Sequence, residues 1–459
     1  MTPLLNRTER QKLLILLATL SGVLLSALDG TATSTAMPKI AEQLHGTGSL
    51  TWVTTAYLLA STVTIPVYGR LADLHGRRLP LLTGLTLFLA GSALCALAGD
   101  MPQLIVFRVV QGLGAGALMT VGMTLVRDLY PPERSTGLMR MQTLMAGLMV
   151  VSFLGGPLEG GLLTDHLGWR WIFLVNLPIG AAAVAVLATL VPHHRPEDRD
   201  TGRFDTAGVL LLTAAISLVL VALGTDHMLT LLPLGLALLA AFVFVERRAS
   251  VPIVPLRLYA GRTYRAVTVA GFLFTAASMP AGLFFGLYFQ QVRGYGATAS
   301  GLMIVPLMAG MLAGNRGTAL IVLRTGRVKG LLAGGAVLMA CASASLAAID
   351  VLPVWVTVGC AGLIGLGTAP AMGGIAIAAQ MSVERRDIGA ATAGLNLLKQ
   401  LGGSAGLAVG QGLLVAQAEL ARAIGTTIAV VGAVGGLLAL GAVLTMADLD
   451  VMPAPVTAR

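Results

Sequence analysis

Charge and cysteine are scarce in this chain of 459 residues. Only 11% of the residues are charged and 56% are hydrophobic, whereas a soluble globular domain carries about 25% charged residues. This balance excludes a soluble enzyme, a disordered chain and a nucleic-acid module, so the net charge of +9 does not indicate a nucleic-acid partner. The three cysteines, Cys95, Cys341 and Cys360, lie in apolar runs; they lack metal-ligand spacing, and their odd number argues against a disulfide framework.

Motifs of enzymatic and ATP-driven chemistry are also missing. No Gly-Lys dipeptide occurs, which excludes a P-loop and hence a primary ATP pump. No HExxH element appears, and the six histidines are predicted to lie in loops. We therefore expect neither an enzyme nor a bound cofactor or metal.

Long apolar runs fill most of the chain, and a membrane span needs about 20 such residues. We predict an all-α polytopic membrane protein with fourteen transmembrane helices. Their ranges are 13–36, 51–71, 79–99, 103–127, 137–163, 169–191, 205–224, 228–246, 264–292, 297–323, 330–349, 353–380, 388–416 and 425–447.

Lysine and arginine are concentrated at the start of the chain and in every second predicted loop. The alternate loops contain only isolated basic residues, which are Lys39, Arg170, Arg293 and Arg422. Because basic loops stay on the cytoplasmic side, we expect both termini in the cytoplasm and a location in the bacterial cytoplasmic membrane.

An internal repeat relates residues 111–137 to residues 364–389. Both segments run from a Gly-rich apolar stretch to a charged turn, and repeated halves are typical of transporters that work by alternating access. We predict three parts: a six-helix bundle over 1–191, linkers with an inserted helix pair over 192–263, and a second six-helix bundle over 264–459.

The predicted cytoplasmic loop GRLADLHGRR resembles the signature loop of the major facilitator superfamily. The matching residues with a predicted gating role are Gly69, Asp73, Gly76, Arg77 and Arg78. Glycines permit a tight turn, and an aspartate is stabilised by a helix N-terminus, so this loop is a candidate latch for the outward-open state. A purely topogenic loop would explain the arginines but neither the aspartate nor the glycines.

Further motifs narrow this resemblance to the fourteen-span drug:proton antiporters. The stretch 28–40 resembles the first-helix element of that family, and 169–180 is also similar. Arg108 and Gln111 match an R-x-x-Q-G element. The Gly-Pro element of antiporters is matched at Gly156, Pro157, Gly160 and Gly161. The resemblance implies two six-helix bundles with two inserted helices, a monomer, and the proton gradient as energy source.

Five charged residues fall inside predicted spans: Asp29, Arg108, Glu159, Arg316 and Lys399. A charge in the membrane interior costs at least about 2.5–3.5 kcal/mol and is functional by default. Counting helix rise places the first three in the outer third of the first bundle, roughly 6–10 Å deep. We therefore predict one proton-coupling cluster in which Asp29 and Glu159 share or compete for Arg108. The alternative for Asp29 and Arg108 is a permanent ion pair that fixes helix packing. The alternative for Glu159 is that it binds a cationic substrate or faces a wet outer cavity.

A substrate cavity is predicted from polar, Met and aromatic positions, because such side chains suit a permissive pocket. The candidates are Thr33, Tyr57, Gln111, Gln142, Met149, Phe285, Tyr288, Arg316, Asn396, Lys399 and Gln400. For Arg316 the alternatives are snorkelling to the interface and contact with an anionic substrate; for Lys399 they are bracing of the cytoplasmic gate and lining of the cavity.

The predicted function is proton-coupled export of amphiphilic drugs or antibiotics. The alternative is a transporter on the same scaffold that is dedicated to one metabolite, peptide or lipid-like amphiphile. The expected partners are the substrate, protons and the lipid bilayer, and the sequence leaves the charge of the substrate open.

Overall fold

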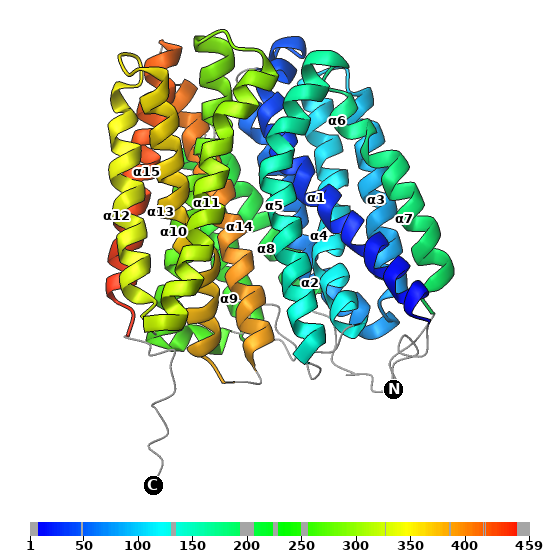
Figure 1. Ribbon diagram of the computed structural model, residues 1–459. Coiled ribbons are helices and arrows are strands. Elements are labelled where there is room, and N and C mark those ends of the chain that lie inside the picture. Colours follow the sequence, from blue (N-terminus) through cyan, green and yellow to red (C-terminus); the bar gives the residue numbers. More distant parts are fainter. Residues whose placement is uncertain are drawn as a thin grey trace. The chain divides into compact units, whose positions relative to one another are not determined.

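The computed structural model describes the chain as a series of helices joined by turns (Figure 1). The described residues are 8–46, 49–129, 135–192, 206–223, 228–248, 256–325, 327–384, 387–415, 417 and 419–447. They fall into two compact units. Unit 1 comprises Met1–Thr213 with Gly296–Gly301, and unit 2 comprises Ala214–Tyr295 with Leu302–Arg459.

Unit 1 contains the first seven helices and the beginning of an eighth. They are α1 (Glu9–Gln43), α2 (Leu50–His75), α3 (Arg78–Leu97), α4 (Met101–Leu129), α5 (Ser135–His166), α6 (Trp171–Leu174), α7 (Asn176–Leu190) and the start of α8 (Thr206–Leu223). A capping box starts α1: Thr8 Oγ1 accepts from the Gln11 amide at 3.3 Å, and the Thr8 amide donates to Gln11 Oε1 at 3.3 Å. Such reciprocal bonds satisfy amides that have no partner inside the helix.

Close packing of α4 between α2 and α3 positions the centre of unit 1. A Cβ on Gly91 of α3 would lie 2.4 Å from the backbone nitrogen of Gln111, and one on Gly112 would lie 2.5 Å from the Tyr57 carbonyl oxygen of α2. Only glycine allows backbones to approach this closely. Consequently the backbone of α4 that carries Arg108 and Gln111 lies very close to α2 and α3. Phe88 and Val121 belong to the apolar core of this unit.

Unit 2 is built around α10, which packs against α13, α14 and α15. The described helices of this unit are the end of α8, α9 (Met228–Glu246), η2 (Leu256–Ala260), α10 (Arg262–Leu287), η3 (Tyr288–Val292), α11 (Ala297–Thr325) after its first turn, α12 (Lys329–Ala344), η4 (Ser345–Ala348), α13 (Val354–Met381), α14 (Ile388–Val415) and α15 (Leu420–Leu444). Glycines again set the contact: a Cβ on Gly402 or Gly406 of α14 would lie 2.1 Å from the carbonyl oxygen of Phe272 or Ala276 of α10.

Within the described residues, each of the fourteen predicted segments coincides with one helix or with two consecutive helices. Eleven helices of that part of the chain are long and apolar enough to cross a membrane, and 207–219 forms a shorter apolar helix. The all-helical membrane fold is thereby confirmed, whereas fourteen as the number of spans stays a prediction.

Candidate functional site

Asp29 of α1 and Arg108 of α4 form an ion pair in the interior of unit 1. Both side chains are fully buried, and Arg108 Nη1 donates to Asp29 Oδ2. Helix rise alone predicts one depth for both residues, and the structure brings them into direct contact. A pair of opposite charges is the arrangement in which buried ions are tolerated.

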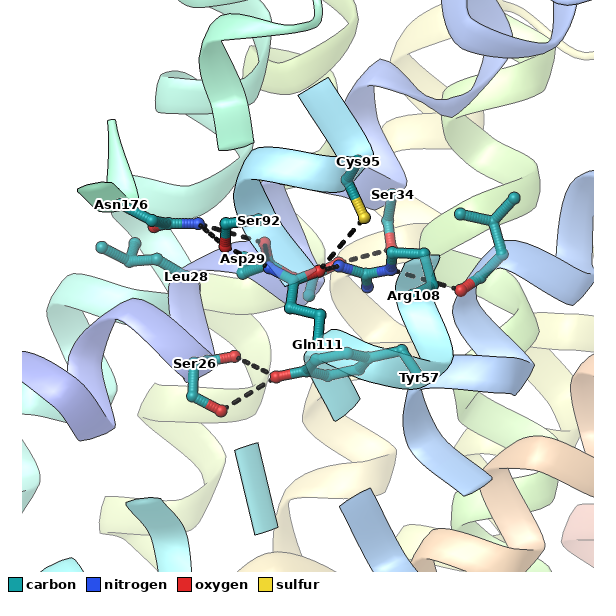
Figure 2. Close-up of polar contacts among 12 residues, drawn as sticks. Ser26, Leu28, Asp29, Ser34, Tyr57, Ser92, Cys95, Arg108, Gln111 and Asn176 are labelled. Atoms are coloured by element: carbon teal, nitrogen blue, oxygen red, sulfur yellow. Dashed lines mark hydrogen bonds and ion pairs between the residues drawn. The ribbon is translucent and has the colours of Figure 1, made fainter. Parts of the chain in front are cut away.

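Arg108 is held from three further directions (Figure 2). Its Nε donates to the Val53 carbonyl oxygen at 3.3 Å, and its Nη1 donates to Gln111 Oε1 at 2.7 Å. The guanidinium carbon lies 4.2 Å from the ring centroid of Tyr57, a favourable cation–π distance. Arg108 Nη2 is buried without a hydrogen-bond partner, so the guanidinium retains one unused donor group.

The second carboxylate oxygen of Asp29 faces a group of neutral donors. Asp29 Oδ1 accepts from Gln111 Nε2 at 2.8 Å and from Asn176 Nδ2 at 3.4 Å. The same two amides donate to Ser92 Oγ, at 2.8 and 3.2 Å. The resulting network joins side chains from α1, α3, α4 and α7 (Figure 2), and Gln111 connects both members of the ion pair.

Ser92 and Asn176 were not among the predicted site residues. Asn176 falls in the stretch 169–180 that carried the family resemblance, and an amide in an apolar span was the signal available there. Tyr57 and Gln111 lie in or against this network, and their predicted place in a substrate cavity stays a prediction. Tyr57 is 5% exposed, and its hydroxyl lies 2.9 Å from Ser26 Oγ. Their position is set by the contact of α2, α3 and α4, which sequence spacing does not reveal.

Glu159 lies on α5 beside α1 and is half-buried. The Gly-Pro element brings these two helices together: a Cβ on Gly156 would lie 1.8 Å from Thr31 Oγ1, and one on Gly160 would lie 2.4 Å from the Ala32 carbonyl oxygen. Among the described hydrogen bonds and ion pairs, Arg108 engages Asp29 and not Glu159. These contacts show the guanidinium on one carboxylate, and the predicted coupling role of Asp29, Arg108 and Glu159 stays a prediction.

The far end of α5 contacts the first turn of α11, which belongs to unit 1. A Cβ on Gly161 would lie 2.7 Å from Thr298 Cα, and the buried Pro157 has its carbonyl oxygen 2.4 Å from a Cβ placed on Gly301. Asp165 accepts from the amides of Ala297 and Thr298 at 3.0 and 2.7 Å. Burial raises the pKa of this carboxyl, but the hydrogen bonds from Thr298 and Ala297 outweigh it and leave the pKa below its usual range.

The loop signature occupies the turn between α2 and α3. Gly76 has a φ of 80°, a left-handed conformation that favours glycine. Arg78 Nη2 donates to the Ala188 carbonyl oxygen near the end of α7, where a cation complements the helix dipole. A Cβ on Gly69 would lie 3.8 Å from the Thr120 side chain, and the side chain of Asp73 lies outside the described residues, so the latch stays a prediction.

The other predicted cavity residues differ in burial. Thr33 is fully buried and its hydroxyl has no hydrogen-bond partner. Phe285 and Tyr288 are fully buried, and the Tyr288 hydroxyl donates to the Ile349 carbonyl oxygen at 3.0 Å. Arg316 and Asn396 are exposed, whereas Lys399 and Gln400 are half-buried; the side chains of Gln142 and Met149 lie outside the described part.

Comparison with known proteins identifies the class to which this fold and buried site belong. The family model of the Major Facilitator Superfamily matches residues 19–407. The chain therefore belongs to that superfamily, and it is a membrane-spanning transporter.

Particular relatives refine this assignment. The multidrug transporter protein MdtP of Bacillus subtilis is 32% identical over 411 residues, which are 87% of this chain and 74% of that protein. The tetracenomycin C resistance and export protein of Streptomyces glaucescens is 33% identical over 409 residues, which are 86% of this chain and 74% of that protein. The crystal structure of a point mutant of the nucleoside transporter NupG superposes with a TM-score of 0.68 at 12% identity over 94% of this chain and 99% of that one, which shows a shared fold.

Proposed function

We propose that this transporter exports amphiphilic drugs or antibiotics from the cytoplasm in exchange for protons, by alternating access in the bacterial cytoplasmic membrane. The relatives named for multidrug transport and for antibiotic export support the efflux direction. The buried Asp29–Arg108 pair is the observation that carries the proton coupling. In this proposal both termini are cytoplasmic, the monomer is the working unit, and the proton gradient supplies the energy.

Proton binding at Asp29 acts on the contact between α1 and α4. An unpaired charge in the membrane interior is costly, so the charged carboxylate keeps Arg108 close to it. A proton that binds a carboxylate oxygen removes that attraction and makes separation of the two side chains less costly. The proton thus converts a tight helix contact into a weaker one.

Arg108 has other partners that allow this step. The Val53 carbonyl, Gln111 and the face of Tyr57 contact the guanidinium and continue to hold it once Asp29 is neutral. Gln111 and Asn176 likewise continue to donate to the Oδ1 atom of Asp29. Release of the proton on the other side of the membrane restores the ion pair and resets the cycle.

The test is transport in vesicles containing the full chain, with an imposed pH gradient. Replacement of Asp29 by Asn keeps the shape of the side chain and removes the titrating group, so we expect loss of gradient-driven export with substrate exchange retained. Glu42→Gln is the matched control, because Glu42 pairs with Lys39 on the exposed end of α1 at 3.0 Å. Gradient-driven export that persists in both Asp29→Asn and Glu159→Gln would overturn the proposed coupling site.

A further inference from the structure

Helices α10 to α15 of unit 2 differ from the helices of unit 1, which carry interior charges of both signs. In unit 1, carboxylates occur within α1 and α5 as Asp29 and Glu159. None of the six helices α10 to α15 contains an aspartate or a glutamate, whereas Arg316 and Lys399 lie well inside α11 and α14. A cation in the interior of these helices therefore has no acidic partner on them.

Lys399 lies at the junction of three helices of unit 2. A Cβ on Gly271 of α10 would lie 3.2 Å from Lys399 Cγ, and Lys399 Nζ donates to the Ala371 carbonyl oxygen of α13 across a long 3.5 Å. An ammonium has three donors, and this contact uses one of them weakly.

Other polar groups lie at the same estimated level of unit 2. Asn315 of α11 approaches α13 near Ala371, because a Cβ on Gly373 would lie 2.8 Å from Asn315 Oδ1. Successive helices alternate in direction, so α11 ends on the side where α14 begins (Figure 1). Arg316 lies about 14 Å from the end of α11, and Lys399 lies about 16 Å from the start of α14, at 1.5 Å per residue. Asn396, one turn before Lys399, is exposed.

We propose that Lys399 anchors an anionic group of the exported amphiphile, such as a carboxylate or an ionised enol or phenol. This inference rests on the proposed export function and specifies its substrate class. An ammonium that is half-buried inside the membrane without a counter-ion is costly, and an anionic substrate supplies that counter-ion while it occupies the site. The same ammonium disfavours a cationic analogue, since placing like charges together is costly.

Equilibrium binding to the purified full chain tests this without any proton gradient. The probes are two dansyl amphiphiles with the same alkyl chain, one ending in a carboxylate and the other in an ammonium group. Wild type is expected to prefer the carboxylate probe. Lys399→Gln should bind that probe about 10- to 100-fold more weakly, the range of a lost charge-assisted hydrogen bond, and should leave binding of the ammonium probe unchanged or improved.

Two further variants make the result interpretable. Lys399→Arg retains the charge and should keep the carboxylate preference, and Lys39→Gln removes an exposed lysine and should change nothing. If Lys399→Gln does not fold, the wild-type preference and its persistence in Lys399→Arg decide the question. Three outcomes would overturn the proposal: a wild-type preference for the ammonium probe, binding of neither probe, or equal losses for both probes in Lys399→Gln. Equal losses would mean that Lys399 supports the packing of the helices and does not recognise the charge of the substrate. Asp29→Asn should keep the carboxylate preference, which separates this outcome from a failure of proton coupling.

Discussion

At the scale of single residues, Gln111 connects the two halves of the buried ion pair. Its Oε1 accepts from Arg108 at 2.7 Å, and its Nε2 donates to Asp29 at 2.8 Å and to Ser92 at 2.8 Å. An amide offers both a donor and an acceptor, so it remains bonded whether or not the carboxyl carries a proton. The R-x-x-Q spacing puts Gln111 one turn after Arg108, on the same face of α4.

Replacement of Gln111 by Ala should therefore affect both stability and coupling. Loss of the amide leaves buried groups on Asp29 and Arg108 short of a partner, which costs about 1–3 kcal/mol. We expect a lower unfolding temperature in detergent and a reduced rate of gradient-driven export. Gln103→Ala is the control, because the described bonds of the Gln103 side chain are local: it accepts from the Gly99 amide at 3.1 Å and donates to the exposed Asp100 at 3.0 Å. A Gln111→Ala protein that matches this control in both measurements would contradict the role.

At the scale of helices, the Gly-Pro element sets the distance between α5 and α1. Gly160 lies against the backbone of Ala32, and Gly156 against Thr31, which itself donates to the Ser152 carbonyl oxygen at 3.1 Å. Small residues permit such approaches in membranes. The element therefore acts as a packing surface, with Glu159 carried beside it.

Replacement of Gly160 by Ala should force these two helices apart. The new Cβ would lie 2.4 Å from the Ala32 carbonyl oxygen, and overpacking of this kind costs about 1–3 kcal/mol. Thermal unfolding in detergent measures the loss. Gly334→Ala in α12 is the matched control, since nothing lies within 4 Å of its new Cβ; there we expect unchanged stability or a gain of about 0.5–1 kcal/mol.

A second prediction at this scale concerns Asp165, which accepts hydrogen bonds from two amides in the first turn of α11. Capping side chains contribute about 1 kcal/mol, so Asp165→Ala should lower the unfolding temperature. The pKa of this carboxyl is lowered by hydrogen bonds that outweigh burial, so its contribution is complete above the ordinary aspartate value of about 3.9 and is lost as pH falls through the lower folded value. A stability difference between wild type and variant that declines already between about pH 8 and pH 5 would contradict this assignment.

At the scale of the whole molecule, the two units carry different chemistry. Unit 1 contains the buried acid–base pair, and unit 2 contains interior cations without carboxylates on the same helices. In the two proposals made above, proton coupling and substrate recognition therefore fall on separate sets of helices. With separate residues for the two ligands, the proton and the substrate do not compete for one side chain.

Expression in an efflux-deficient bacterial host tests the breadth of transport. We expect increased resistance to several chemically different amphiphiles, and loss of that resistance in Asp29→Asn at equal membrane abundance. Resistance to a single compound, or none, would instead favour a transporter dedicated to one substrate. Immunodetection of the chain in the membrane fraction is the necessary control for each variant.

The sequence alone determined the class of fold and the residues of the ion pair. The apolar runs predicted helices that the structure contains, because in a membrane the backbone N–H and C=O groups must find their hydrogen bonds within the protein. The basic loops and the five interior charges predicted the orientation and the candidate site. Helix rise placed Asp29 and Arg108 at one depth because both lie on regular helices.

Only the tertiary structure decided which side chains meet. It placed Gln111 and Tyr57 in the ion-pair network, added Ser92 and Asn176 to it, and paired Arg108 with Asp29 and not Glu159. These contacts depend on how far each helix is rotated and how closely its glycines let a neighbour approach. Neither quantity is contained in hydropathy or in spacing along one helix, and it is the packing of several helices that fixes both.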